Sequence, residues 1–157
     1  DTLVHEWPDE EDLADIAERC AEVARDLGLE PRVAFVSFST FGYPVSERAE
    51  KMHIAPRVLE QRGVDFEFEG EMTVDVALSA RARSQFPFAR LTDNANILVV
   101  PARHSASISV KLMQEMAGAT VIGPILSGVD KPIQICSTNA TVNDIMNMAL
   151  LAASKVN

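Results

Sequence analysis

A small polar turn and a nearby carboxylate stand out in the last third of the sequence. The turn is Ser137-Thr138-Asn139, and Asp144 lies in the first turn of the helix expected after it. Hydroxyl, amide and carboxylate groups can orient a ligand, and the free backbone amides at a helix N-terminus can hold an anion. We interpret this turn as a place where a ligand binds.

Both parts of this stretch also have a purely structural interpretation. Thr141-Val142-Asn143-Asp144 fits the Ser/Thr-x-x-acid pattern, with Thr141 as N-cap and a carboxylate that favours the helix dipole. Ser137 can likewise be a turn residue. The sequence leaves the capping role and the functional role of Asp144 open.

Two further polar clusters follow stretches that are expected to be strands. Ser37, Ser39 and Thr40 come after an apolar run, and Arg103 comes after a second one. In open parallel sheets, ligands bind beyond the carboxyl ends of the strands. These residues together could line a ligand site, although turn and capping roles explain any one cluster better.

The spacing of apolar residues alternates along the chain between that of helices and that of strands. The polar clusters lie where these predicted elements meet. Helices are expected at 9–28, 46–61, 73–78, 105–116 and 141–154, and strands at 33–38, 65–69, 96–101, 121–126 and 132–136. Residues 79–93 are expected to form a long loop. The order predicts an α/β fold with a mainly parallel, doubly wound three-layer sheet and helices on both faces.

Some elements carry more specific expectations. Pro56 should kink or restart the second helix, because it removes a backbone donor. The strand at 65–69 alternates apolar and acidic residues, so one face should lie in water. The helix at 105–116 should turn four apolar side chains inward, namely Ile108, Leu112, Met113 and Met116.

Composition limits the class of protein. The chain has 157 residues with 47% hydrophobic and 24% charged content, which suits a single core. Its net charge of −9, from 23 acidic and 14 basic residues, argues against binding to nucleic acid or to acidic membranes. We find no metal-ligand spacing, no membrane-spanning run and no signal peptide, so we expect a cytoplasmic protein without a metal site in this stretch.

Several motifs resemble one known family. They are Asp1-Thr2-x-Val4, Glu30-Pro31-Arg32-Val33-Ala34, Ser37-Phe38-Ser39, Gly70-Glu71-Met72, Asp75-Val76-Ala77-Leu78, Ala95-Asn96-Ile97-Leu98 with Pro101, Lys111-Leu112-x-Gln114, Ile122-Gly123-Pro124-Ile125-Leu126, Lys131-Pro132, and Asp144-Ile145 with Asn147-Met148. The chain resembles phosphate acetyl/butyryl transferases, and more closely the phosphotransacetylase-like C-terminal domain of bacterial multidomain malic enzymes. The resemblance implies that residues 1–157 are the C-terminal half of such a domain.

The resemblance also implies roles for individual residues. Phosphotransacetylases interconvert acetyl-CoA and phosphate with acetyl phosphate and CoA, which needs a base for the thiol and a guanidinium for the phosphate. Ser137 and Asp144 match the family's catalytic serine and aspartate, but Thr138 stands where the family has an arginine. The ligand-binding positions implied are Ser37, Ser39, Thr40, Arg103, Ser107, Gly123, Pro124, Thr138 and Asn139.

Three functions remain open. The chain could be a regulatory domain that senses acetyl-CoA or CoA and has no transferase activity of its own. It would then be attached to a malic-enzyme catalytic domain that uses NAD(P) and a divalent metal to decarboxylate malate to pyruvate. Alternatively it is part of an active phosphate acetyltransferase, or an oligomerisation module with a vestigial cleft. In each case we expect the other half of the domain as a partner, and a homo-oligomer.

Overall fold

The computed structural model describes residues 1 and 3–154, and the chain divides into two compact units. The first unit comprises Asp1 and Leu3–Ala106, and the second begins at Ser107. Each unit is described by itself below.

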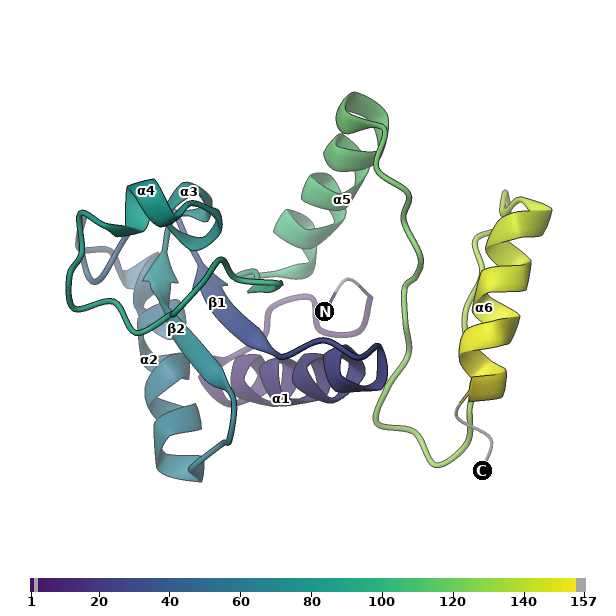
Figure 1. Cartoon of the computed structure of the whole chain (residues 1–157), viewed down its shortest axis with the longest axis horizontal. Helices are drawn as coiled ribbons and strands as arrows, with labels where there is room; N and C mark the ends of the chain where they lie inside the picture. Colours follow the sequence, from purple (N-terminus) through teal and green to yellow (C-terminus); the bar gives the residue numbers. More distant parts are fainter. Residues whose placement is uncertain (2, 155–157) are drawn as a thin grey trace. The chain divides into compact units, whose positions relative to one another are not determined.

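A three-stranded parallel sheet forms the centre of the first unit (Figure 1). Strand β1 (Arg32–Val36) lies between β2 (Glu67–Met72) and β3 (Ile97–Val99). The three strands occupy positions where the sequence predicts strands, although β3 is shorter than expected. The parallel pairing confirms the predicted α/β class.

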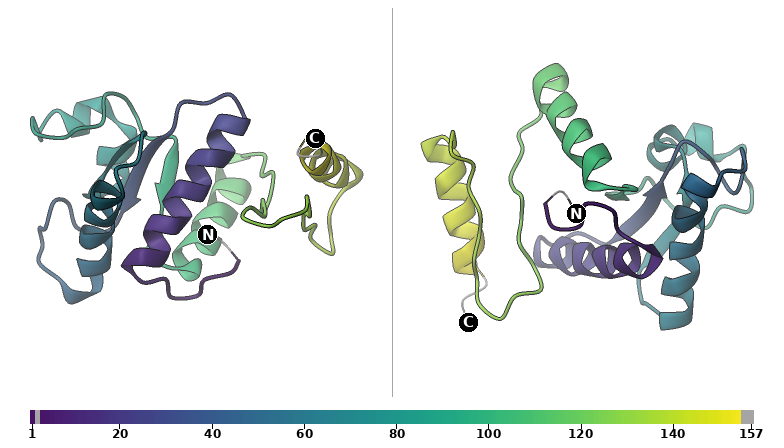
Figure 2. Two further views of the ribbon diagram at one scale, coloured as in Figure 1. Left: turned by 90° about the horizontal axis from the view of Figure 1, so that it is seen from below. Right: turned by 180° about the vertical axis from the view of Figure 1, so that it is seen from behind.

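Helices α1 (Glu10–Asp26) and α2 (Glu47–Arg62) pack on one face of this sheet. Figure 2 shows α1 lying across the strands when the molecule is seen from below. Both helices have local start signals, since Asp9 forms a capping box with Asp12 and Ser46 caps α2. Leu13, Phe35, Met52, Leu59 and Val99 belong to the core cluster between these helices and the sheet.

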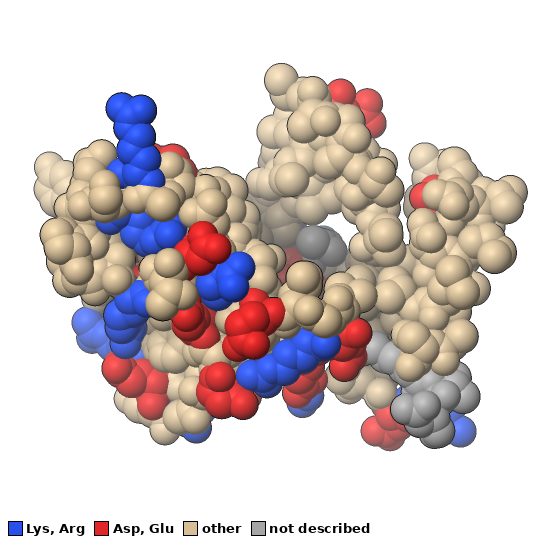
Figure 3. Space-filling model, viewed as in Figure 1, with Lys and Arg blue, Asp and Glu red and all other residues tan. Residues whose placement is uncertain are grey.

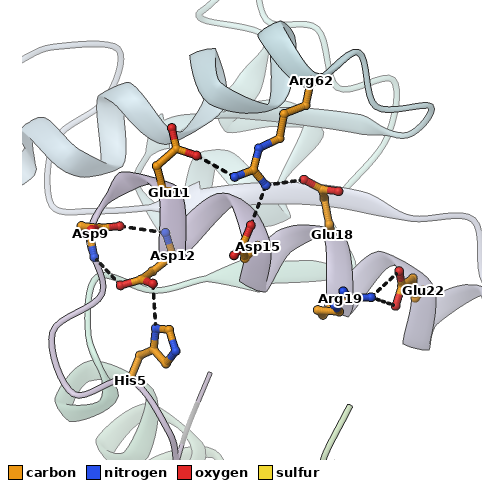
Figure 4. A network of polar contacts seen from close by, with 9 residues as sticks. All are labelled: His5, Asp9, Glu11, Asp12, Asp15, Glu18, Arg19, Glu22 and Arg62. Carbon is orange, nitrogen blue, oxygen red and sulfur yellow. Dashed lines mark hydrogen bonds and ion pairs between the residues drawn. The ribbon is translucent and has the colours of Figure 1, made fainter. Parts of the chain in front are cut away.

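A network of ion pairs joins α1 to α2 (Figure 4). The Arg62 guanidinium contacts Glu11, Asp15 and Glu18 at 2.6 Å each. The hydrogen bonds that Arg62 donates to these three carboxylates raise the pKa of Arg62 above its usual value. Arg62 therefore ties the C-terminal turn of α2 along one side of α1.

The opposite face of the sheet is covered by α3 (Val74–Leu78), α4 (Ala80–Arg83) and the segment that follows them. The apolar cluster on this side contains Ala34, Val36, Met72, Val76 and Leu91, among other residues. Alternate residues of β1 thus enter two different cores, as the pleat of a strand requires. The predicted layers on both faces are present in this unit.

Helix α2 does not restart at Pro56, which lies buried inside it. Two other specific expectations are wrong in part. The acidic side of the strand at 65–69 does not lie in water throughout, because Glu69 is buried and accepts the backbone N–H of Arg90 at 2.6 Å. The predicted loop at 79–93 begins with the short helix α4, whose N-cap is Ser79.

The second unit contains most of α5 (Arg103–Ala117), which begins in the first unit, and α6 (Val142–Ser154). The strands predicted at 121–126 and 132–136 are not formed: both segments lie outside the helices and strands of the described residues. A side chain replaces part of that pairing: the Gln134 amide accepts from the Leu126 N–H at 3.0 Å and donates to its carbonyl at 3.3 Å.

Apolar side chains of the second unit are largely exposed. Met148 is the one buried hydrophobic residue in the described part of this unit. The prediction that the helix at 105–116 buries its apolar face is wrong, since Ile108, Leu112, Met113 and Met116 are all exposed. Exposed residues also include Ile122, Val129, Ile133, Ile135, Val142, Ile145, Met146 and Leu150. Few charged side chains interrupt this surface on the face drawn in Figure 3.

A chain segment of this composition needs a covering partner. Contiguous apolar surface is rare on soluble monomers and marks places where another protein surface binds. Within the described residues, none of the helices combines the length and the apolar character that crossing a membrane requires.

Candidate functional site

The turn before α6 presents its polar groups to solvent. Ser137, Thr138 and Asn139 are all exposed. The Ser137 hydroxyl hydrogen-bonds to the Asn139 side-chain oxygen, and the Ala140 N–H donates to the Ser137 carbonyl at 3.1 Å. Thr138 has no recorded side-chain contact among the described residues, so its hydroxyl is available to a ligand.

Asp144 forms the capping box that the sequence allowed. Its Oδ2 accepts the Thr141 N–H and the Thr141 hydroxyl, both at 2.8 Å, while the Asp144 N–H donates to Thr141 Oγ1 at 3.2 Å. These two donors from Thr141 hold the pKa of Asp144 below its usual value. A general base works best when its pKa lies near the working pH, so this environment makes Asp144 a weak one.

The remaining site residues of the second unit have simpler surroundings. Gly123 and Pro124 lie in the irregular segment before α6, where Gly123 has a φ of 147° that favours glycine. Ser107 is half-buried on α5 and has no recorded hydrogen bond in the described part of the chain. The second unit brings the turn and Asp144 together, and leaves Ser107 on a different element.

The polar cluster after β1 lies at the carboxyl end of the strand, as predicted. Ser39 is buried, and its hydroxyl lies 3.3 Å from that of Ser37. Thr40 Oγ1 accepts the Thr73 N–H at 3.1 Å. These hydroxyls hold the loop after β1 against the end of β2, so all three predicted ligand residues already have partners within the protein.

Arg103 also has partners within the protein. Its Nη1 donates to the Leu3 carbonyl at 3.3 Å, and its backbone N–H donates to the Glu6 carbonyl at the same distance. The guanidinium thus contacts the N-terminal segment of its own unit. His104, the neighbouring residue, is exposed.

A buried glutamate near the β1 loop escaped the sequence analysis. The Glu71 side chain is 1% exposed and accepts the Gly42 N–H at 2.8 Å and the His53 ring nitrogen Nδ1 at 2.8 Å. Burial by itself would raise the pKa of Glu71. The donors Gly42, Ser39 and His53 outweigh it and hold the pKa below the usual value.

His53 in turn contacts Arg57, whose Nη2 lies 2.8 Å from His53 Nε2. The sequence places Glu71, His53 and Arg57 on two elements with no visible link between them. The one available signal in the sequence is that Glu71 is an acidic residue in a predicted strand region. In the structure, both faces of that strand are covered. Among the described residues, no group of three His, Cys, Asp or Glu side chains is arranged to hold a metal ion.

Comparisons with known proteins agree with this fold. Residues 1–153 match the phosphate acetyl/butaryl transferase family. The chain is 54% identical over 153 residues to the NADP-dependent malic enzyme of Rhizobium meliloti (strain 1021), covering 98% of this chain and 20% of that protein. It is 31% identical to the phosphate acetyltransferase of Bacillus subtilis (strain 168), covering 99% of this chain and 48% of that protein.

Solved structures show the same relationship. A phosphotransacetylase from Streptococcus pyogenes superimposes with a TM-score of 0.92 at 29% identity, covering 98% of this chain and 47% of that one. The chain therefore spans about a fifth of this malic enzyme and about half of the Bacillus subtilis transferase and of the Streptococcus pyogenes structure. The resemblance read from the motifs is confirmed, and the chain belongs to the phosphate acetyl/butaryl transferase family.

Proposed function

We propose that the chain is the acetyl-CoA- or CoA-responsive part of a malic enzyme and has no transferase activity of its own. The attached catalytic domain would decarboxylate malate to pyruvate with NAD(P) and a divalent metal. Support comes from the malic enzymes among the relatives, which share 54% and 40% identity with this chain in two examples.

The observation that carries the proposal is the absence of a guanidinium at the turn before α6. Thr138 follows Ser137, and the sequence contains no arginine after Arg103. A hydroxyl cannot make the bidentate, charged contact with which arginine binds phosphate. Losing one charge-assisted hydrogen bond costs about 1.5–3 kcal/mol, or roughly one to two decades in rate.

The environment of Asp144 also supports a chain without transferase activity. Its lowered pKa keeps the carboxylate ionised and reduces its tendency to take a proton from a thiol. An exposed turn that has Ser137, Asn139 and free amides can still hold a polar ligand by hydrogen bonds. Ligand binding without group transfer suits a sensor.

An active phosphate acetyltransferase is the second candidate. The free-standing transferases of Bacillus subtilis and Clostridium acetobutylicum, at 31% and 37% identity, favour it. In that case the other half of the domain would supply the arginines for phosphate. An oligomerisation module with a vestigial cleft is the third candidate, and the exposed apolar residues of the second unit favour it.

The intact protein distinguishes the first two candidates in an acetyl phosphate assay. We expect no acetyl phosphate above the blank from acetyl-CoA and phosphate, because the guanidinium is missing. Thr138→Arg restores that group, and we expect it to bring formation to about tenfold or more above the blank. Thr120→Arg places the same side chain at another exposed threonine of the unit and should have no effect. Activity in the parent protein that Asp144→Asn abolishes would establish the transferase instead.

A further inference from the structure

The loop after β1 contains a tight hairpin turn, Thr40-Phe41-Gly42-Tyr43. Thr40 and Tyr43 exchange both backbone hydrogen bonds, at 2.8 and 3.1 Å. Phe41 and Gly42 have positive φ angles of 50° and 88°, which one class of two-residue hairpin turn requires at its central residues. Glycine adopts this backbone readily, whereas a residue with a large side chain such as Phe41 rarely does. The backbone of Phe41 is therefore strained.

Contacts with the end of β2 hold this strained turn in place. The Phe41 N–H donates to the Glu71 carbonyl and the Gly42 N–H donates to Glu71 Oε1, both at 2.8 Å. The Thr73 N–H donates to Thr40 Oγ1 at 3.1 Å. Strained backbone persists only where its surroundings fix it, and such positions cluster at functional sites. The turn is thus a rigid support for the side chains next to it.

An uncharged surface surrounds the turn, and we call it the hairpin patch. The Phe41 ring packs edge-on against Phe86 and Phe88, with ring centroids 5.2 and 4.9 Å apart, which joins residues 38–46 to residues 84–89. Neither of these two segments contains a charged residue. Aromatic residues without charges among them are typical of the centre of a protein–protein interface. The exposed residues of the hairpin patch are Phe38, Tyr43, Pro44, Val45, Pro87 and Phe88.

The core of the first unit does not account for the apolar residues on the outside of the patch. The rings of Phe41 and Phe86 pack against the buried cluster below. Tyr43 is 80% exposed and Val45 is 91% exposed, so neither side chain contributes much to that core. Exposed apolar side chains that are gathered in one place mark a surface where another protein surface binds.

The lengths of the relatives indicate which protein surface this is. The Bacillus subtilis transferase is about twice as long as this chain, whereas the Rhizobium meliloti malic enzyme is about five times as long. The malic enzyme therefore has additional chain beyond a complete domain of transferase size. The other half of such a domain is expected to cover the apolar residues of the second unit. The additional chain is then the partner left for the first unit.

We propose that the hairpin patch binds the malic-enzyme catalytic domain of the intact protein. This inference rests on the proposed function, because it names the contact through which the response to acetyl-CoA reaches malate oxidation. Ser37, Ser39 and Thr40, which the family resemblance assigns to the ligand, are continuous with the turn. A ligand that changes the hydrogen bonds of these hydroxyls moves the turn, and with it Tyr43 and Val45. The partner surface is apolar and has an acceptor for the Tyr43 hydroxyl.

Photo-cross-linking in the intact protein tests which surface lies against the patch. A benzophenone-bearing phenylalanine in place of Tyr43 should form cross-links to peptides of the malic-enzyme catalytic domain, identified by mass spectrometry. The same group in place of Leu29, an exposed apolar residue of the first unit outside the patch, is the control and should give no such product. Products that join position 43 to a second copy of residues 1–157 or to the other half of the domain would overturn the proposal. So would the absence of any product beyond the neighbouring loop.

The rate of malate oxidation separates this contact from the response itself. Tyr43→Ser combined with Val45→Ser should reduce the effect of acetyl-CoA on that rate to less than about twofold, while calorimetry shows unchanged acetyl-CoA affinity. Leu27→Ser combined with Leu29→Ser changes two exposed apolar residues elsewhere in the unit and should keep the full response.

Two negative results of the kinetic experiment have different meanings. A parent protein that does not respond to acetyl-CoA would contradict the proposed function, and the cross-links would still test the contact. A parent protein and a Tyr43→Ser/Val45→Ser variant that respond equally would overturn the role of the hairpin patch and leave the proposed function standing.

Discussion

Asp144 uses one carboxylate oxygen to cap its helix and leaves the other one free. Oδ2 accepts both bonds from Thr141, while Oδ1 has no recorded partner among the described residues. The capping role and a ligand-binding role therefore do not exclude each other. What the cap changes is the basicity, because bonds to the ionised form lower the pKa and make proton abstraction less favourable.

Glu71 gives a prediction about pH and stability. Its pKa in the folded chain lies below the value of about 4.3 expected in the unfolded chain. Its contribution to stability is therefore complete above about pH 4.3 and is lost as pH falls through the folded-state value. Glu71→Gln should cost about 1–3 kcal/mol at pH 7, as for a buried group that loses charged hydrogen bonds.

Urea unfolding of the parent protein and of Glu71→Gln between pH 7 and pH 3 measures this effect. The difference between the two proteins should shrink as the solution is acidified. Glu50→Gln, at an exposed glutamate of α2, provides the control and should remain within about 0.5 kcal/mol of the parent at every pH. A difference that grows on acidification would contradict the role assigned to Glu71.

The two carboxylates also show which contacts a sequence can reveal. The Thr141–Asp144 pair spans three residues on one helix, so the pattern alone predicts it. The contact between His53 and Glu71 joins a helix to a strand 18 residues away, and it depends on how α2 packs on the sheet. No local spacing encodes that packing.

At the scale of elements, α1 and α2 are joined by one arginine as well as by their apolar faces. Arg62 lies among three carboxylates, and its side chain is 32% exposed. Because these pairs are partly exposed, solvent screens them, and we expect Arg62→Met to cost about 1 kcal/mol at low salt. Most of this cost should vanish in 1 M salt, where the screening length is about 3 Å.

Thermal unfolding at low and high salt tests the Arg62 network. Arg19→Met is the matched control, since it removes a single pair with Glu22 within α1, in which both side chains are more than half exposed. That variant should lose little stability at either salt concentration, because solvent screens an exposed pair. Equal losses in the two variants would show that the three carboxylates do not act together.

The elements also separate what the sequence could predict from what it could not. Helices α1, α2 and α6 carry their own caps, and β1 is a run of buried residues, so these elements were predicted correctly. The segments 121–126 and 132–136 have the composition of strands, but a strand forms only beside a neighbour. Their partners are not among the described residues.

At the scale of the whole molecule, we infer why the segments 121–126 and 132–136 form no strands. The transferases of Bacillus subtilis and Streptococcus pyogenes are about twice as long as this chain, and the second unit exposes most of its apolar side chains. We expect the other half of the domain to cover this surface and to pair with both segments. Hydrogen exchange should then show rapid exchange of amides at 119–140 in residues 1–157 alone and strong protection in the intact protein.

Strand β1 serves as the internal reference for that experiment, because its sheet is complete within the first unit. Its amides should be protected in both samples. Equal protection of 119–140 in the short chain and in the intact protein would show that this segment needs no further partner.

The central claim is that this family member responds to a CoA thioester without transferring its acyl group. The most direct measurement is the rate of malate oxidation by the intact protein, with and without saturating acetyl-CoA. We predict a change of about fivefold or more, the usual lower range of coupling between two sites. An unchanged rate and an unchanged malate KM in the presence of acetyl-CoA would contradict the claim.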